Sequence, residues 1–225
     1  MNLVCGVIVK NEADRYLKRV IENNLQICNK IIILDDNSSD NTIDICRSYG
    51  DKISVFKAIN SWDNEWLLRD ELLQYMLKER SDYVWICDAD EIYCESFIEE
   101  SKIIMSKNIP IVSFYFYDMW NSENKYRSDK YFGVGTGVRM CRSDLLKDYK
   151  WNKNKRHCGS LPFSILGNTP TYIATTKVKH LGYLKEEDRI RKYKEKTEDD
   201  KNNEFYSKEV YQEILNNSPP LYNFI

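Results

Sequence analysis

The stretch Y-V-W-I-C-D-A-D-E, from Tyr83 to Glu91, decides the fold that this sequence predicts. Its first half is a short apolar run rich in β-forming residues, which is typical of a buried strand in a parallel sheet. Asp88 and Asp90 follow at the expected carboxyl end of that strand, where open α/β sheets bind ligands. Paired carboxylates there favour a hard divalent cation that carries phosphate. An acidic surface turn is the simpler interpretation of the spacing alone, because D-x-D is a short pattern.

Strands and helices alternate on the amino-terminal side of this stretch. Apolar runs and helical spacing of apolar residues predict strands at 3–9, 31–34 and 53–56 and helices at 16–27, near 43–46 and at 64–78. This alternation is typical of a mostly parallel, doubly wound α/β sheet flanked by helices.

The pattern changes on the carboxyl side. We expect a helix at 96–106, long strands at 109–117 and 132–141, an irregular basic and aromatic loop at 151–164, and charged helices at 186–201 and 204–215. The two later strands are predicted to be mixed or antiparallel and to form a smaller second sheet. One domain is expected for the whole chain, 1–225.

Composition narrows the classes of protein that the sequence can be. The formal net charge of −2 gives no overall attraction to nucleic acid, so no nucleic-acid partner is expected. The seven cysteines contain no C-x-x-C pair, which fits a reducing compartment and predicts a cytoplasmic location. The first residues lack a basic region, so we expect no signal peptide, and no run reaches the roughly 20 apolar residues of a transmembrane helix.

Polar residues follow three of the predicted parallel strands. Asn11 and Glu12 follow the first, Asp35 and Asp36 end the second, and the aspartates of the central stretch end the fourth. Side chains at these strand ends converge on one crevice. The sequence has no G-x-G-x-x-G and no Walker loop, so backbone amides alone do not bind the phosphates. We therefore expect a metal ion to neutralise them.

Together these motifs resemble family 2 glycosyltransferases, which have the GT-A fold. The matching motifs are V-K-N-E at 9–12, I-L-D-D-N-S-S-D-N-T at 33–42, W-I-C-D-A-D-E at 85–91, and K-H-L-G-Y-L at 179–184 followed by Arg189 and Lys192-Tyr193. The resemblance implies a GT-A, Rossmann-like central sheet that is mostly parallel and flanked by helices. It also implies a nucleotide-sugar-binding half at 1–108, an acceptor-binding half at 109–184 and carboxyl-terminal helices at 185–225.

The resemblance further implies a metal-dependent, inverting glycosyltransferase. It would move a sugar from a nucleotide diphosphate donor, usually a UDP-sugar, to a glycan, lipid-linked or protein acceptor. Mn²⁺ or Mg²⁺ would be bound by the DXD motif, Asp88 and Asp90, and His180 would complete the metal or diphosphate site. A polar residue that caps a strand end is an equal alternative for His180. Matching positions would place the donor among Asn11, Glu12, Asp35, Asp36, Arg69 and Asp88, with Lys185 adding positive charge near the phosphates.

An inverting transfer needs a general base that takes the proton of the acceptor hydroxyl. His157 sits about where the base of the resembled family falls, and a neutral imidazole can accept that proton. The sequence H-C-G at 157–159 departs from the acidic pair that many relatives carry. Asp118 and Asp129 are the alternative bases, and a structural role is an alternative for all three.

Two other functions compete with a sugar transferase. A nucleotidyltransferase of similar fold usually has a glycine-rich basic loop after the first strand, whereas this turn is Lys10-Asn11-Glu12-Ala13. A non-catalytic nucleotide-binding domain would keep the pocket and lack a competent base. Peripheral contact of the carboxyl-terminal helices with a membrane, and the oligomeric state, are left open by the sequence.

Overall fold

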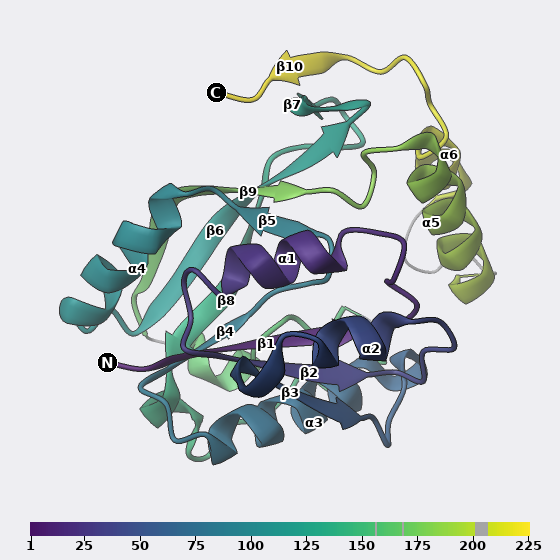
Figure 1. Ribbon diagram of the computed structural model, residues 1–225. Coiled ribbons are helices and arrows are strands. Elements are labelled where there is room, and N and C mark those ends of the chain that lie inside the picture. Colours follow the sequence, from purple (N-terminus) through teal and green to yellow (C-terminus); the bar gives the residue numbers. More distant parts are fainter. Residues whose placement is uncertain (156, 168, 201–206) are drawn as a thin grey trace.

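The computed structural model describes residues 1–155, 157–167, 169–200 and 207–225. Its centre is the predicted parallel sheet (Figure 1), in which the strands lie side by side in the order β4, β1, β2, β3. These strands are β1 (Leu3–Val9), β2 (Lys30–Asp35), β3 (Ile53–Lys57) and β4 (Tyr83–Ile86). Every residue of β1 is buried, as expected for a central strand covered on both faces.

Helices cover both faces of this sheet (Figure 1). Alternate side chains of β1 point to opposite faces, so Cys5 and Val7 pack in one core while Val4 and Ile8 pack in the other. Three helices contribute to the first core, namely α1 (Leu17–Asn24), α2 (Thr42–Arg47) and α4 (Ser96–Ser106). The second core is covered by α3 (Glu65–Lys78). The predicted strand-helix alternation is therefore confirmed through β4.

The sheet continues beyond β4 with antiparallel strands. β8 (Gly135–Arg142) pairs with β4, and β6 (Ile111–Trp120) pairs with β8. β7 (Ser122–Arg127) and β10 (Leu221–Asn223) extend this part, while β9 (Thr171–His180) runs parallel to β6 and antiparallel to the short strand β5 (Glu91–Tyr93). β6 and β8, which the sequence assigns to a second sheet, therefore extend the main sheet, and the small antiparallel second sheet consists of β7, β10 and the end of β6.

Several of these strands differ from the sequence prediction, which contains no strand for β5, β7, β9 or β10. β5 and β10 have three residues each, and β7 has the polar sequence S-E-N-K-Y-R, so none carries a strong hydrophobic period. The strand predicted to begin at Phe132 begins at Gly135, because Phe132 packs with Trp120 and Tyr183 in a separate small core.

The carboxyl-terminal part contains α5 (Glu186–Asp199) and α6 (Lys208–Glu213), which lie side by side (Figure 1). Both predicted charged helices are thus present, although residue 201 of the first and residues 204–206 of the second lie outside the described part of the chain. Short 3₁₀ turns occur at Gly50–Lys52, Trp62–Asn64, Ser143–Leu146 and Phe163–Ile165. Among the described residues, no helix combines the length and the apolar character needed to cross a membrane.

Candidate active site

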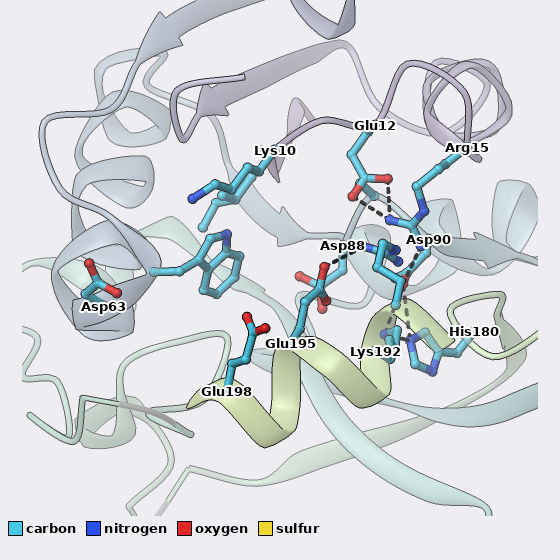
Figure 2. A pocket seen from close by; sticks show the side chains of 14 residues that line it. Lys10, Glu12, Arg15, Asp63, Asp88, Asp90, His180, Lys192, Glu195 and Glu198 are labelled. Carbon is cyan, nitrogen blue, oxygen red and sulfur yellow. Dashed lines mark hydrogen bonds and ion pairs between the residues drawn. The ribbon is translucent and has the colours of Figure 1, made fainter. Parts of the chain in front are cut away.

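A cavity of about 470 Å³ lies at the carboxyl ends of β1 and β4 (Figure 2). Lys10 and Glu12 line it from the turn after β1, and Asp88 and Asp90 line it from the turn after β4. α5 forms the opposite wall with Arg191, Lys192, Glu195 and Glu198. The strand ends that the sequence predicts to converge therefore do so for β1 and β4, and a helix from the far end of the chain closes over them.

Strand register brings His180 to the same cavity. His180 is the last residue of β9, where it stands opposite Glu91 of β5 and opposite Asp118 of β6. The next residue, Leu181, donates its backbone N–H to the carbonyl oxygen of Asp90 at 2.7 Å. The imidazole consequently lies between Asp90 and Asp118.

Asp90 is surrounded by cationic side chains (Figure 2). Its Oδ2 atom lies 3.3 Å from Lys192 Nζ, 3.5 Å from His180 Nε2 and 4.0 Å from Arg15 NH2. Burial raises the pKa of this carboxyl group, but Lys192 and His180 outweigh burial and hold the pKa well below its ordinary value. Asp90 is therefore ionised at neutral pH.

His180 is oriented by Asp118, whose Oδ1 lies 2.5 Å from the Nδ1 atom of the ring. Burial and Lys192 lower the pKa of His180, whereas Asp90 and Asp118 raise it, and the result is a pKa of about 9. The two carboxylates thus favour the protonated ring, which is a cation that can bind an anionic ligand.

Asp88 lies between two arginines. Arg139 NH2 is 3.2 Å from Asp88 Oδ2, and Arg69 NH1 is 3.7 Å from Asp88 Oδ1. Burial raises the pKa of Asp88, but Arg139 and Arg69 lower it more and hold it below its ordinary value. Glu91 fixes the turn, because its carboxylate accepts the backbone N–H of Asp88 at 3.0 Å and the guanidinium of Arg139 at 2.5 Å.

Arg15 connects the turn after β1 to α5. Its NH1 atom donates to both carboxylate oxygens of Glu12 at 2.6 Å, and its Nε atom lies 3.4 Å from Asp188 Oδ1. Burial raises the pKa of Glu12 to about 7 even though Arg15 lowers it. Glu12 therefore positions the Arg15 guanidinium at the cavity, and it is also a candidate ligand for the nucleotide-sugar donor.

The other residues predicted to bind the donor are less exposed to the cavity. The side chain of Asp36 is 1% exposed and accepts Lys10 Nζ at 2.9 Å. Asp35 accepts the backbone N–H of Ser38 at 3.1 Å, and Asn11 adopts a left-handed backbone with φ of 53°. Asn11, Asp35 and Asp36 are not among the described residues that line the cavity, whereas Lys10 is.

Arg69 and Lys185 also lie outside the lining. Arg69 is buried, donates to Glu65 Oε1 at 2.8 Å and lies 5.4 Å from the ring centroid of Trp62, which does line the cavity. Lys185 is the N-cap residue of α5 and borders a second pocket. Arg69 thus acts on the cavity through Asp88 and Trp62.

The three predicted bases are placed apart. Asp118 contacts His180, and His180 lines the cavity. Asp129 accepts Arg127 Nε at 2.6 Å and the backbone N–H groups of the residues that follow it at 131 and 132. His157 is exposed, and its backbone N–H donates to Glu65. Neither Asp129 nor His157 is among the described residues that line the cavity.

The carboxylates at the cavity fit one kind of metal site. In the described part of the chain, no group of three or more His, Cys, Asp or Glu side chains is arranged to bind a metal ion. Asp88 and Asp90 nevertheless offer hard carboxylate oxygens at the cavity, and Mg²⁺ is commonly bound by one or two carboxylates together with phosphates and waters. The pair therefore fits a cation that arrives with a diphosphate, and not a self-contained metal centre.

Three site residues have no assigned role in the sequence analysis, namely Arg15, Arg139 and Lys192. Arg139 carries a usable signal, because it is a charged residue between Val138 and Met140 in a strand. Lys192 belongs to the matching motif around 179–193, but the charged residues on all sides of α5 do not show that it reaches the cavity.

Known proteins similar to this chain include a glycosyltransferase from Bacillus subtilis. The SPbeta prophage-derived glycosyltransferase SunS is 26% identical over 192 residues, which cover 84% of this chain and 42% of SunS. This chain thus spans less than half the length of that curated relative.

Solved structures share the fold. The crystal structure of S. aureus TarS 1-349 matches with a TM-score of 0.61 at 13% identity, covering 96% of this chain and 69% of that chain. The crystal structure of the same TarS fragment in complex with UDP-GlcNAc matches with a TM-score of 0.59 at 13% identity, covering 96% and 70%. The predicted GT-A fold is confirmed.

The family model described as glycosyl transferase family 2 matches residues 5–161. The match covers more than half of the chain and includes most of β1, all of β4 and both aspartates of the cavity. By this match the chain belongs to glycosyl transferase family 2.

Proposed function

We propose that this chain transfers a sugar from a UDP-sugar to an acceptor hydroxyl, with the donor diphosphate bound in the cavity between Asp90 and α5. The observation that carries the proposal is the set of cations that meet two carboxylates there, since Lys10, Arg15, His180 and Lys192 all line one cavity with Asp88 and Asp90. Such a mixed set can bind a diphosphate and a divalent cation together.

The leaving group of this reaction is a nucleoside diphosphate, which gains negative charge as the sugar departs. Lys192 and protonated His180 lie close enough to Asp90 to stabilise that charge without transferring a proton. Asp118 keeps the imidazole in place through its hydrogen bond to Nδ1. We assign Asp118 an orienting role on this basis.

Asp88 and Asp90 would bind Mn²⁺ or Mg²⁺ in this proposal. The metal would supply Lewis-acid stabilisation of the diphosphate. Arg69 and Arg139 lower the pKa of Asp88 and keep this carboxylate ionised at neutral pH.

The nucleoside is proposed to lie towards Lys10 and Trp62. Lys10 is paired with Asp36, and the indole of Trp62 lies against the Arg69 guanidinium, so both groups are held at the cavity edge. An aromatic face is a common stacking partner for a nucleobase. UDP-GlcNAc is the first donor to test because the TarS structure contains it.

The test is release of UDP from UDP-GlcNAc, measured with and without Mn²⁺, in wild type and in Asp90→Asn. We expect metal-dependent release that falls at least about a hundredfold in Asp90→Asn, because the neutral amide is a weaker ligand for the cation that stabilises the leaving diphosphate. Asp144→Asn is the matched control, because Asp144 is an exposed carboxylate paired with Arg142 far from the cavity.

The rival functions give different results in the same assay. UDP binding by calorimetry without turnover of any UDP-sugar would indicate a non-catalytic nucleotide-binding domain. Formation of a nucleotide sugar from an NTP and a sugar phosphate would indicate a nucleotidyltransferase. Either result would contradict the proposed function.

A further inference from the structure

The ion pair between Lys192 and Asp90 joins the last long helix to the turn after β4 (Figure 2). Lys192 Nζ lies 3.3 Å from Asp90 Oδ2 and 3.2 Å from His180 Nε2. The two side chains are only 17% and 12% exposed, so water screens the pair weakly. An ammonium group thus occupies the carboxylate oxygen that a divalent cation would use.

Gly182 makes this close approach possible. A Cβ atom at position 182 would lie 2.4 Å from Lys192 Nζ and 2.5 Å from Asp90 Oδ2. Real Cβ atoms do not approach heavy atoms that closely, so any larger residue would force the two side-chain ends to move. Gly182 therefore leaves room for the contact of lysine with aspartate.

The cationic neighbours differ in how firmly they are fixed. Arg15 binds Glu12 through two hydrogen bonds and also lies beside Asp188, so its guanidinium is tied on two sides. Lys192 has a flexible four-carbon stem and a compact charge, and its ammonium group lies 4.9 Å from the ring centroid of Tyr183. Lys192 is consequently the cation that can leave Asp90 at the smallest structural cost.

A divalent cation and a diphosphate have opposite effects on this lysine. A cation that approaches Asp90 alone meets Lys192 and Arg15 at short range and is repelled. A diphosphate attracts the same ammonium group and can draw it off the carboxylate. The two ligands should then help each other to bind, since such coupling is reciprocal.

We propose that Lys192 is a positioning residue that keeps divalent cations off Asp90 until the diphosphate of a nucleotide takes over its ammonium group. The inference rests on the proposed donor site and adds an order of events to it. Metal binding follows diphosphate binding, because the carboxylate becomes available only when the lysine moves.

The first test measures binding of Mn²⁺ alone, without nucleotide, from the electron paramagnetic resonance signal of the free ion. Lys192→Met keeps the aliphatic stem and removes the charge, so it should bind Mn²⁺ at least about tenfold more tightly than wild type, or 1.4 kcal/mol. Arg191→Met is the matched control. Arg191 lines the same cavity from the neighbouring position of α5, but it pairs with Glu195 at 3.0 Å.

Equal Mn²⁺ affinity of wild type and Lys192→Met would overturn the proposal. An equal gain in Arg191→Met would also overturn it, because the effect would then be one of overall charge and not of the contact with Asp90. Thermal unfolding of each variant checks that the fold is retained.

The second test needs no variant. Addition of UDP should tighten Mn²⁺ binding to wild type at least about tenfold, and this gain should be smaller in Lys192→Met. A gain of the same size in both proteins would contradict the role of Lys192. If UDP does not bind at all, the proposed function fails, while the comparison with Mn²⁺ alone still decides whether Lys192 blocks the carboxylate.

Discussion

Arg139 shows how one residue holds the turn that carries the DXD motif. It lies in β8, with NH2 2.5 Å from Glu91 Oε1 and 3.2 Å from Asp88 Oδ2. Its guanidinium also packs 4.7 Å from the ring centroid of Phe116. Removal of one partner from a buried ion pair typically costs about 3–5 kcal/mol, because the remaining charge is left uncompensated.

Arg139→Met is therefore expected to lower the free energy of unfolding by about 3 kcal/mol, which corresponds to a Tm about 10 °C lower. Thermal unfolding followed by circular dichroism measures this. The double variant Arg139→Met/Glu91→Gln should regain part of the loss, since it removes the orphaned charge. Arg142→Met is the control, because Arg142 forms an exposed pair with Asp144. Equal losses in Arg139→Met and Arg142→Met would contradict the argument.

Between elements, Glu100 attaches α4 to β9. Its carboxylate accepts the backbone N–H groups of Thr175 and Thr176, both at 2.8 Å, and the hydroxyl of Tyr172 at 3.0 Å. Burial raises the pKa of Glu100, but hydrogen bonds from Thr176 and Thr175 outweigh burial and hold the pKa below its ordinary value. The ionised form is thus the one that stabilises the contact between helix and strand, and β9 is the strand that ends in His180.

Glu100→Ala is expected to cost about 2 kcal/mol at pH 7, or about 5 °C in Tm, because two strand amides lose a charged acceptor. A carboxylate with a depressed folded-state pKa stabilises above its unfolded pKa, and the contribution is lost as the pH falls through the folded value. The gap in Tm between wild type and variant should therefore shrink below about pH 4. Melting curves from pH 7 to pH 3 measure it.

Glu99→Ala is the matched control for this element, since the Glu99 side chain is 74% exposed and pairs with Lys102 nearby on the helix. Its effect should stay within about 0.5 kcal/mol. If the difference in Tm between wild type and Glu100→Ala stays constant with pH, the charge of Glu100 does not account for the stabilisation.

For the whole molecule, the cavity is closed by segments that lie far apart in the sequence. Tyr16 donates its hydroxyl to Asp188 Oδ2 at 2.6 Å, and Arg15 lies beside the same carboxylate, so the start of α1 is joined to α5. A ligand in this cavity would contact both the amino-terminal half and the last long helix. Binding should therefore stabilise the complete fold and not one half of it.

UDP-GlcNAc with Mn²⁺ is expected to raise the Tm. At a ligand concentration about 100 times the Kd, the stabilisation is about 2.7 kcal/mol, or about 5–10 °C for a chain of this size. Hydrogen exchange should slow in α5 and in the turn at 10–16, and should change little in β7 and β10. Slower exchange confined to the amino-terminal half would show that α5 does not take part in binding.

By itself, the sequence determined the parallel half of the sheet and the position of its acidic strand ends. Apolar runs such as 3–9 and helical spacing such as 64–78 depend on near neighbours in the chain, so β1 to β4 and α3 follow from local pattern. Asp88 and Asp90 could be placed at the cavity for the same reason, since they follow a buried strand directly.

Only the tertiary structure decided which partners these aspartates meet. The pairing of β9 with β5 and β6 sets His180 beside Asp90 and Asp118, and the packing of α5 sets Lys192 on Asp90. It also placed Asp129 and His157 away from the described lining of the cavity. Strand register and helix packing are set by contacts between residues distant in sequence, and side-chain period and composition do not encode these contacts.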